Sequence, residues 1–95
     1  MELTLEAAAN VDEHRRRLRL PESHGLRIRL SDDRTAFETS FTAGPDAGDE
    51  VVSFWGTQVY VAPELTDALR DHALVVDDDA VPARLVLRAR ERQSV

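Results

Sequence analysis

The chain has 95 residues, no cysteine and a formal net charge of −6, so it can build one small domain with a single modest core. The absence of cysteine excludes disulfides, thiolate metal sites, cysteine nucleophiles and cysteine-held iron–sulfur clusters. The negative charge disfavours general nucleic-acid binding, which needs a basic face to neutralise phosphates.

The amino-terminal segment predicts a helix. The start MELTLEAAAN has no basic segment and no long apolar run, so we expect no secretory or membrane-spanning segment and a cytoplasmic protein. Residues 3–5 form a short strand or a lead-in, and Thr4 is suited to cap the helix. Over residues 6–18 one face collects Ala7, Val11, His14 and Leu18. Asp12 and Arg16, four residues apart, can pair, and Pro21 ends the helix.

Two segments then predict a first hairpin. Residues 26–30 alternate apolar residues with Arg27 and Arg29, and residues 36–42 return after the turn at 31–34. The second strand should present one face made of Phe37, Thr39 and Phe41. Glu38 lies on its other face, where Arg27 or Arg29 should oppose it.

The stretch from Gly48 to Leu65 predicts a second hairpin and a short helix. In the first strand Val51, Ser53 and Trp55 alternate with Val52 and Phe54, and in the second Val59 and Val61 alternate with Gln58 and Tyr60, a period of two typical of a strand with one buried face. Gly56 can adopt a positive φ in a tight turn, and Pro63 ends the ladder and starts a helix over 63–71 that carries His72 at its end. Residues 73–77 and 85–87 predict two further strands, with a solvated turn at 77–79 and a flexible charged tail at 88–95.

This order of elements indicates one α+β domain spanning residues 1–95. Mostly antiparallel hairpins are combined with one amino-terminal helix and one short helix, a pattern that differs from a doubly wound sheet.

With its elements in this order, the chain resembles the HesB-like, or A-type (IscA-like), family of iron–sulfur cluster biogenesis. The resemblance spans about residues 3–87 and is carried by the order of short pieces: Leu3-Thr4 before Ala7-Ala8, Gly25-Leu26-Arg27-Ile28, Phe37, Gly48-Asp49-Glu50-Val51, Gly56 before Val59-Tyr60-Val61, Pro63 before Leu69, and Leu85-Val86-Leu87. It implies a small β-rich sandwich or barrel-like domain. The best-known members of the family carry or scaffold iron or iron–sulfur clusters.

The resemblance also implies three cysteine ligands, all of which this chain lacks. The family has one in the turn after the 26–30 strand, which falls here near Asp33 or Arg34, and two in a Cys-Gly-Cys tail after the last strand. The tail here reads Arg88-Ala89-Arg90-Glu91-Arg92-Gln93-Ser94-Val95. We therefore expect the family's fold without its cluster, and no cofactor.

The resulting hypothesis is a non-enzymatic binding or interaction module. The candidate contacts to a protein partner are Phe54, Trp55 and Tyr60, since aromatic residues are enriched in interface hot spots. The preferred alternative for Trp55 is that it folds back onto the domain's own core. A homodimer is a further expectation, because edge strands need covering or charging.

The alternative function is a labile iron or other divalent-metal binder. It would use the histidines and carboxylates His14, His24, His72, Asp32, Asp33, Asp77, Asp78 and Asp79. Their spacing selects no site, and His14 is explained as a half-buried residue at the edge of the apolar stripe. An enzyme is not expected, since the sequence has no nucleophile–base signature, phosphate-binding glycine loop or HExxH motif.

Overall fold

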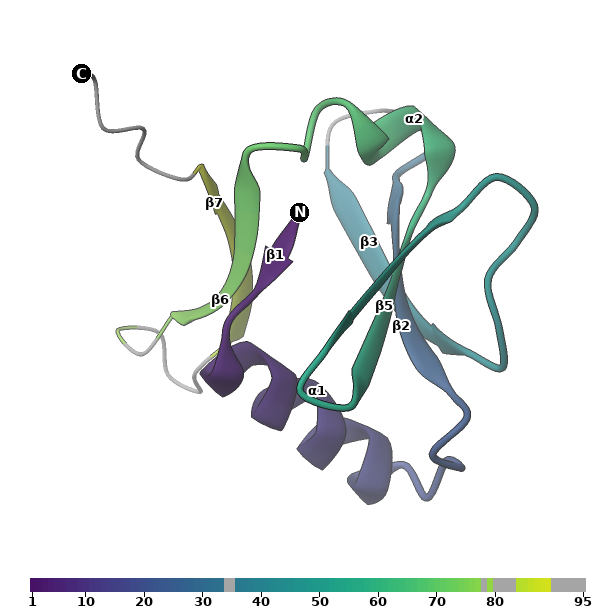
Figure 1. Ribbon diagram of the computed structural model, residues 1–95, viewed down its shortest axis with the longest axis vertical. Coiled ribbons are helices and arrows are strands. Elements are labelled where there is room, and N and C mark those ends of the chain that lie inside the picture. The colour runs from purple at the N-terminus through teal and green to yellow at the C-terminus, as the bar shows by residue number, and fades with distance from the viewer. Residues whose placement is uncertain (34–35, 78, 80–83, 90–95) are drawn as a thin grey trace.

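The computed structural model describes residues 1–33, 36–77, 79 and 84–89 (Figure 1). The elements follow in the order β1 (Glu2–Leu3), α1 (Leu5–Arg17), β2 (Gly25–Leu30), β3 (Phe37–Thr42), β4 (Glu50–Phe54), β5 (Thr57–Val61), α2 (Pro63–Thr66), β6 (His72–Asp77) and β7 (Arg84–Ala89). They form a three-stranded sheet of order β1-β6-β7 and a four-stranded sheet of order β3-β2-β5-β4.

The two predicted hairpins, β2–β3 and β4–β5, are confirmed as antiparallel pairs, and Arg29 opposes Glu38, with its guanidinium 2.7 Å from the carboxylate. The two further predicted strands, β6 and β7, also pair antiparallel with each other. Two parallel pairings, β2 with β5 and β1 with β6, join elements that are distant in sequence. The α+β prediction is therefore confirmed as an arrangement of two helices and two mixed sheets.

Helix α1 begins where the sequence indicates, but its buried face is rotated from the predicted one. The Thr4 hydroxyl accepts a hydrogen bond from the Ala7 amide, as an N-cap does. The buried row steps by four residues through Ala7, Val11 and Arg15. His14 and Leu18 consequently point outward, and Leu18 is 62% exposed, so their predicted burial was wrong. The pair between Asp12 and Arg16 is confirmed at 2.9 Å.

The core lies between α1 and the inward faces of both sheets, as Figure 1 shows from the position of α1 below them. Helix α1 contacts β6 of one sheet and β5 of the other. The buried apolar cluster contains Leu3, Ala7, Ala8, Val11, Leu26, Ile28, Val52, Val59, Val61, Leu65, Leu69 and Leu74. Neither described helix is long and apolar enough to cross a membrane.

Two boundaries differ from the predictions. Helix α2 ends at Thr66 instead of residue 71, because Leu69 is buried in a turn and His72 already begins β6. Arg88 and Ala89 belong to β7, so the strand extends into the segment predicted as a tail. Residues 90–95 of that tail, and Asp78 of the predicted acidic turn, lie outside the described residues.

Candidate functional site

The tip of the β4–β5 hairpin exposes two of the three predicted contact residues. Trp55 and Gly56 have φ angles of +56° and +75°, the positive values that a two-residue type I′ turn requires, and Phe54 pairs with Thr57 below them. The Trp55 side chain is 66% exposed and Phe54 is 41% exposed. The preferred expectation that Trp55 folds back onto the core was therefore wrong: a turn residue between the paired strand ends is directed away from them.

Tyr60, the third predicted contact, is buried. Its side chain alternates with the core residues Val59 and Val61, and it is 2% exposed. The ring packs over Gly25, where a Cβ atom would come within 2.6 Å of it, and the hydroxyl donates to the Gln58 side-chain oxygen at 2.7 Å. Its position offers no accessible side chain to a partner, so Phe54 and Trp55 remain as candidates.

The turn between β2 and β3 contains Asp33, near which the family resemblance places the first cysteine. The Ser31 hydroxyl donates to Asp33 at 2.7 Å and accepts from the Ala36 amide at 3.1 Å, which ties the two ends of the turn together. Arg34, the other residue predicted at this position, lies outside the described residues, as does the tail from residue 90 onward. Asp33 brings an oxygen donor, not a thiolate, to this place.

The three histidines come from separate places in the fold. His14 is on α1, His24 precedes β2, and His72 begins β6. The Nδ1 atoms of His24 and His72 are buried without a hydrogen-bond partner among the described residues. Within the same residues, no three histidines or carboxylates converge into a group that could hold a metal ion.

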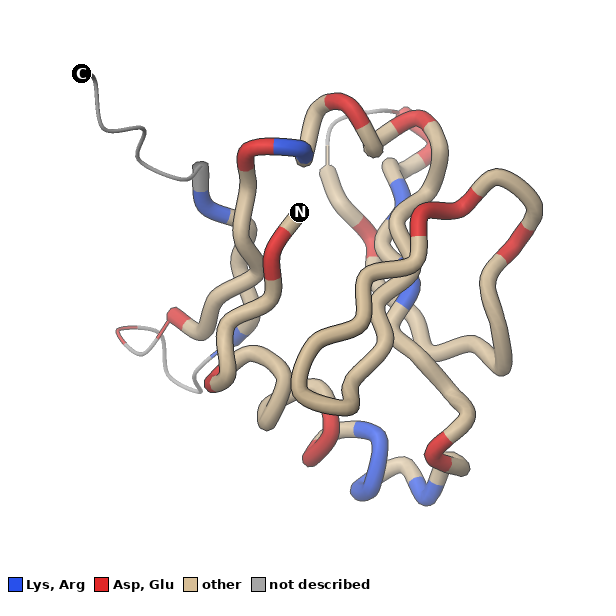
Figure 2. Tube along the Cα trace, in the orientation of Figure 1, with Lys and Arg blue, Asp and Glu red and all other residues tan. Residues whose placement is uncertain are grey.

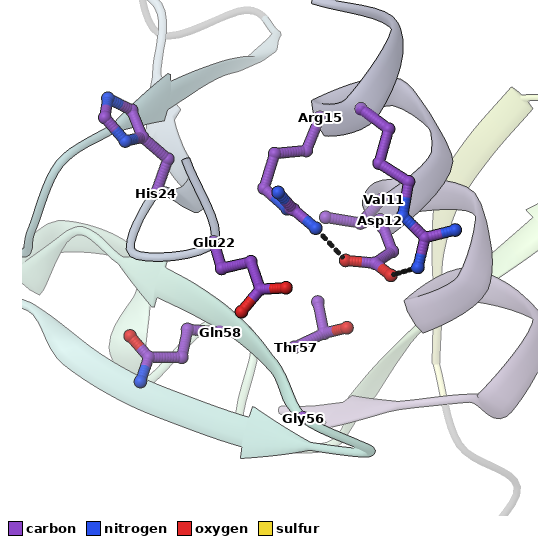
Figure 3. Close-up of a pocket in the computed structure, with 9 residues that line it drawn as sticks. Val11, Asp12, Arg15, Glu22, His24, Gly56, Thr57 and Gln58 are labelled. Carbon is purple, nitrogen blue, oxygen red and sulfur yellow. Dashed lines mark hydrogen bonds and ion pairs between the residues drawn. The ribbon is translucent and has the colours of Figure 1, made fainter. Parts of the chain in front are cut away.

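A small polar cavity of about 200 Å³ lies between the end of α1 and the β4–β5 hairpin (Figure 3). Its lining includes the Asp12 carboxylate, which accepts from Arg15 at 2.8 Å and from Arg16 at 2.9 Å. The hydrogen bond from Arg15 lowers the pKa of Asp12 below its ordinary value. Glu22 points toward this pair, whereas the His24 ring points away from it.

The polar residues that line this cavity are suited to fixing the end of α1 in place. An ionised carboxylate with a lowered pKa is a poor proton carrier near neutral pH. The cavity is also smaller than the 300–1,000 Å³ that is typical of small-molecule sites. Arg15 links the helix to its own exit segment, because its guanidinium also donates to the Leu20 carbonyl at 3.0 Å.

A second ion pair, which the sequence reasoning missed, fastens the loop between β3 and β4 to β2. Asp49 accepts from Arg27 Nε at 3.0 Å and from a terminal guanidinium nitrogen at 3.1 Å, and from the Asp46 amide at 2.9 Å. The hydrogen bonds from Arg27 lower the pKa of Asp49. In the sequence, the Gly-Asp pair at 48–49 contributes only to the family resemblance, and the separation of 22 residues between Asp49 and Arg27 leaves no local pattern that indicates their pairing. Figure 2 shows acidic positions on this loop near basic positions of β2.

Comparison with known proteins agrees with this architecture. No family model and no curated protein matches the sequence significantly. The structure is similar to that of SufA from Escherichia coli, a protein involved in the biosynthesis of iron–sulfur clusters, with a TM-score of 0.76 and 15% identity over 93% of this chain and 83% of SufA. It is also similar to a protein from Aquifex aeolicus, with a TM-score of 0.71 and 19% identity over 93% and 89% of the two chains.

A third similar structure is IscA with a 2Fe–2S cluster. The TM-score is 0.69 and the identity 18%, over 93% of this chain and 80% of IscA. At these identities the likeness concerns the fold. The chain therefore has the fold of the SufA and IscA proteins, and the A-type resemblance drawn from its sequence is confirmed at that level without any of the family's cysteines.

Proposed function

We propose that this protein is a non-enzymatic, cytoplasmic interaction module that uses an A-type scaffold without a thiolate-bound cluster. Its partner is a protein, bound through the tip of the β4–β5 hairpin. The proposal is supported by the likeness to SufA and IscA together with a chain that contains no cysteine. A scaffold that loses its sulfur ligands can keep the surfaces by which it meets other proteins.

The observation that carries this proposal is the conformation and exposure of Trp55. A left-handed backbone costs an L-residue roughly 1–2 kcal/mol, and asparagine and glycine are the residues that suit this turn position. Trp55 adopts φ +56° and leaves 66% of its surface exposed, so neither local conformation nor burial accounts for tryptophan here. Tryptophan is enriched among interface hot spots, so a partner protein that covers Trp55 would account for its presence.

The absence of cluster chemistry is tested by anaerobic incubation of the purified protein with ferrous iron and sulfide. We expect no stoichiometric chromophore and no stoichiometric iron after desalting, because the soft thiolate ligands that hold such clusters are missing. A chromophore at one cluster per chain or per dimer would show that other side chains replace them, and would contradict the proposal.

The partner contact is tested by affinity capture from native extract, followed by binding measurements with the purified, identified partner. The variant Trp55→Asn should lose at least about tenfold in affinity, as expected for an aromatic hot spot. Leu18→Asn is the matched control, since Leu18 is equally exposed, at 62%, but lies at the end of α1. A partner that binds the Trp55→Asn variant as tightly as the parent protein would refute a contact at the hairpin tip.

A further inference from the structure

A second surface, separate from the hairpin tip, is an apolar groove of about 710 Å³ between the two sheets. It is bounded by β2 and β3 on one side, by β7 on the other, and by one face of α1. Its size is within the range of ligand sites, and its lining is mostly apolar. The two walls of this groove are built differently, and that difference indicates what would fill it.

The first wall is the inward face of β3. Phe37, Thr39 and Phe41 lie directly opposite Leu30, Ile28 and Leu26 of β2, on the same face of the sheet. Other side chains cover this face of the sheet over β2 but leave Phe37 on β3 largely uncovered: Ile28 is 1% exposed, whereas Phe37 is 50% exposed. The apolar surface of the core therefore continues onto β3, where it is open.

The second wall is the edge of β7. Four consecutive residues, Arg84 to Leu87, line the groove. Because side chains alternate between the two faces of a strand, a strand that lines a groove with consecutive residues presents its edge to it. Among the described strands β7 pairs with β6 alone, so its other edge carries backbone donors and acceptors that no described strand pairs.

The charge of the groove is opposite to that of the chain. Arg84 is the charged residue among its lining residues, His14 is the other titratable one, and no described aspartate or glutamate lines it. Arg84 forms no ion pair with a described carboxylate, whereas Arg88 at the other end of the strand lies 3.9 Å from Asp77. Figure 2 shows basic positions at both ends of β7. Although the chain has a net charge of −6, the end of the groove at Arg84 is cationic and suited to bind a carboxylate.

We propose that this groove binds an extended segment of a partner protein, which pairs with the edge of β7, places alternate apolar side chains against β3, and sets a carboxylate beside Arg84. This is strand addition to an open sheet edge, in which main-chain hydrogen bonds give affinity and the pockets for alternate side chains give selectivity. A strand fits better than a small amphipathic carboxylate, because only a peptide backbone satisfies the donors and acceptors along β7. The inference does not depend on the hairpin-tip contact.

The probe is a short fluorescent peptide of alternating valine and threonine, made in two forms with an aspartate at either end. Binding to the full chain is followed by fluorescence anisotropy. We expect one of the two forms to bind with a dissociation constant in the micromolar range, with amide chemical-shift changes on β7 and β3 in the unsubstituted protein. The same peptide N-methylated at alternate amides, which removes the donors of one edge, should bind at least about tenfold more weakly.

Variants of the protein test where on its surface the peptide binds. Thr39→Lys puts a charge into the groove and should weaken binding at least about tenfold, whereas Ser40→Lys is the matched control on the opposite face of β3 and should leave affinity within about twofold. Arg84→Gln should weaken the aspartate peptide about fivefold and leave an asparagine peptide unchanged. Trp55→Asn should not alter peptide binding, which keeps this test distinct from that of the hairpin tip.

Three results would overturn the inference. Equal affinity of the N-methylated and parent peptides would show that the backbone of β7 takes no part. Tight binding of laurate, with displacement of the peptide and no effect of peptide methylation, would make the groove a site for small amphiphiles. A dimer in analytical ultracentrifugation that dissociates in Thr39→Lys and not in Ser40→Lys would make a second copy of this chain the occupant.

Discussion

Individual side chains show where this small domain concentrates its polar stabilisation. Asp49 has a fully buried side chain, 0% exposed, and Arg27 is 18% exposed, so their two-point contact is shielded from water. Most other ion pairs lie on the surface, where such a pair contributes about 0–1 kcal/mol. We therefore expect the Arg27–Asp49 pair to have the largest effect of the charged contacts.

Substitution Asp49→Asn should lower the free energy of unfolding by about 2–4 kcal/mol, because it removes the buried counter-charge of a largely buried guanidinium and leaves only the exposed Asp46 carboxylate, 3.4 Å away. Urea denaturation followed by circular dichroism measures the change. Asp46→Asn is the control. The Asp46 side chain is 70% exposed and 3.4 Å from Arg27, and the backbone N–H of residue 46 still donates to Asp49 in the variant. A loss below about 0.5 kcal/mol is expected there, and equal losses in the two variants would argue against burial as the cause.

In contrast to Asp49, Trp55 is a residue whose replacement should stabilise the domain. Trp55→Asn should raise the free energy of unfolding by about 0.5–1 kcal/mol, since asparagine before glycine favours the type I′ turn. Thermal unfolding would detect this as a higher Tm. A destabilisation of more than about 1 kcal/mol would mean that the indole has a structural role, and would weaken the case for a partner at this position.

At the level of elements, local patterns identified the hairpins but not the pairing that joins them. The alternation in β2 and β5 predicted two strands, and the parallel contact of Leu26 with Val59 and Ile28 with Val61 came only with the structure. Nothing in either strand specifies a neighbour more than thirty positions away, because Leu26, Ile28, Val59 and Val61 are apolar residues that would pack equally well against other apolar faces. The same holds for β1 and β6, which pair between the two ends of the chain.

The contact between β2 and β5 explains the glycine that starts β2. An added Cβ at Gly25 would lie 2.6 Å from the Tyr60 ring and 2.9 Å from the Gln58 carbonyl oxygen. Gly25→Ala should therefore destabilise the domain by about 1–3 kcal/mol through overpacking. Gly44→Ala, where no atom lies within 4 Å of the added Cβ, should change stability by less than about 0.5 kcal/mol in the same urea titration. A neutral Gly25→Ala would show that both the Tyr60 ring and the Gln58 backbone can move aside.

For the whole molecule, the two carboxylates with lowered pKa values predict how stability depends on pH. Arg15 lowers the pKa of Asp12 and Arg27 lowers that of Asp49. Their contribution is fully present above the ordinary pKa of about 3.8, and it is lost as the pH falls from there through the lower folded-state values. The free energy of unfolding should thus decrease as the pH falls below about 4.

Urea titrations at successive pH values measure this loss of stability in acid. The variant that combines Asp12→Asn with Asp49→Asn should be less stable at neutral pH but should lose less stability on acidification. The control is Glu13→Gln, whose exposed partner Arg17 lies on the helix surface. If the free energy of unfolding of the combined variant falls with decreasing pH as steeply as that of the parent protein, other carboxylates dominate the loss of stability in acid.

The sequence by itself determined the types and order of the elements, because periodicity, helix caps and turn residues act over a few neighbouring positions. It also determined that no thiolate can hold a cluster, since that depends on composition alone. Tertiary structure decided the parallel pairings, the inward position of Arg15 and Tyr60 and the outward position of Leu18 and Trp55. These depend on which surfaces meet across the fold, and contacts between distant segments leave no local pattern from which they could have been predicted.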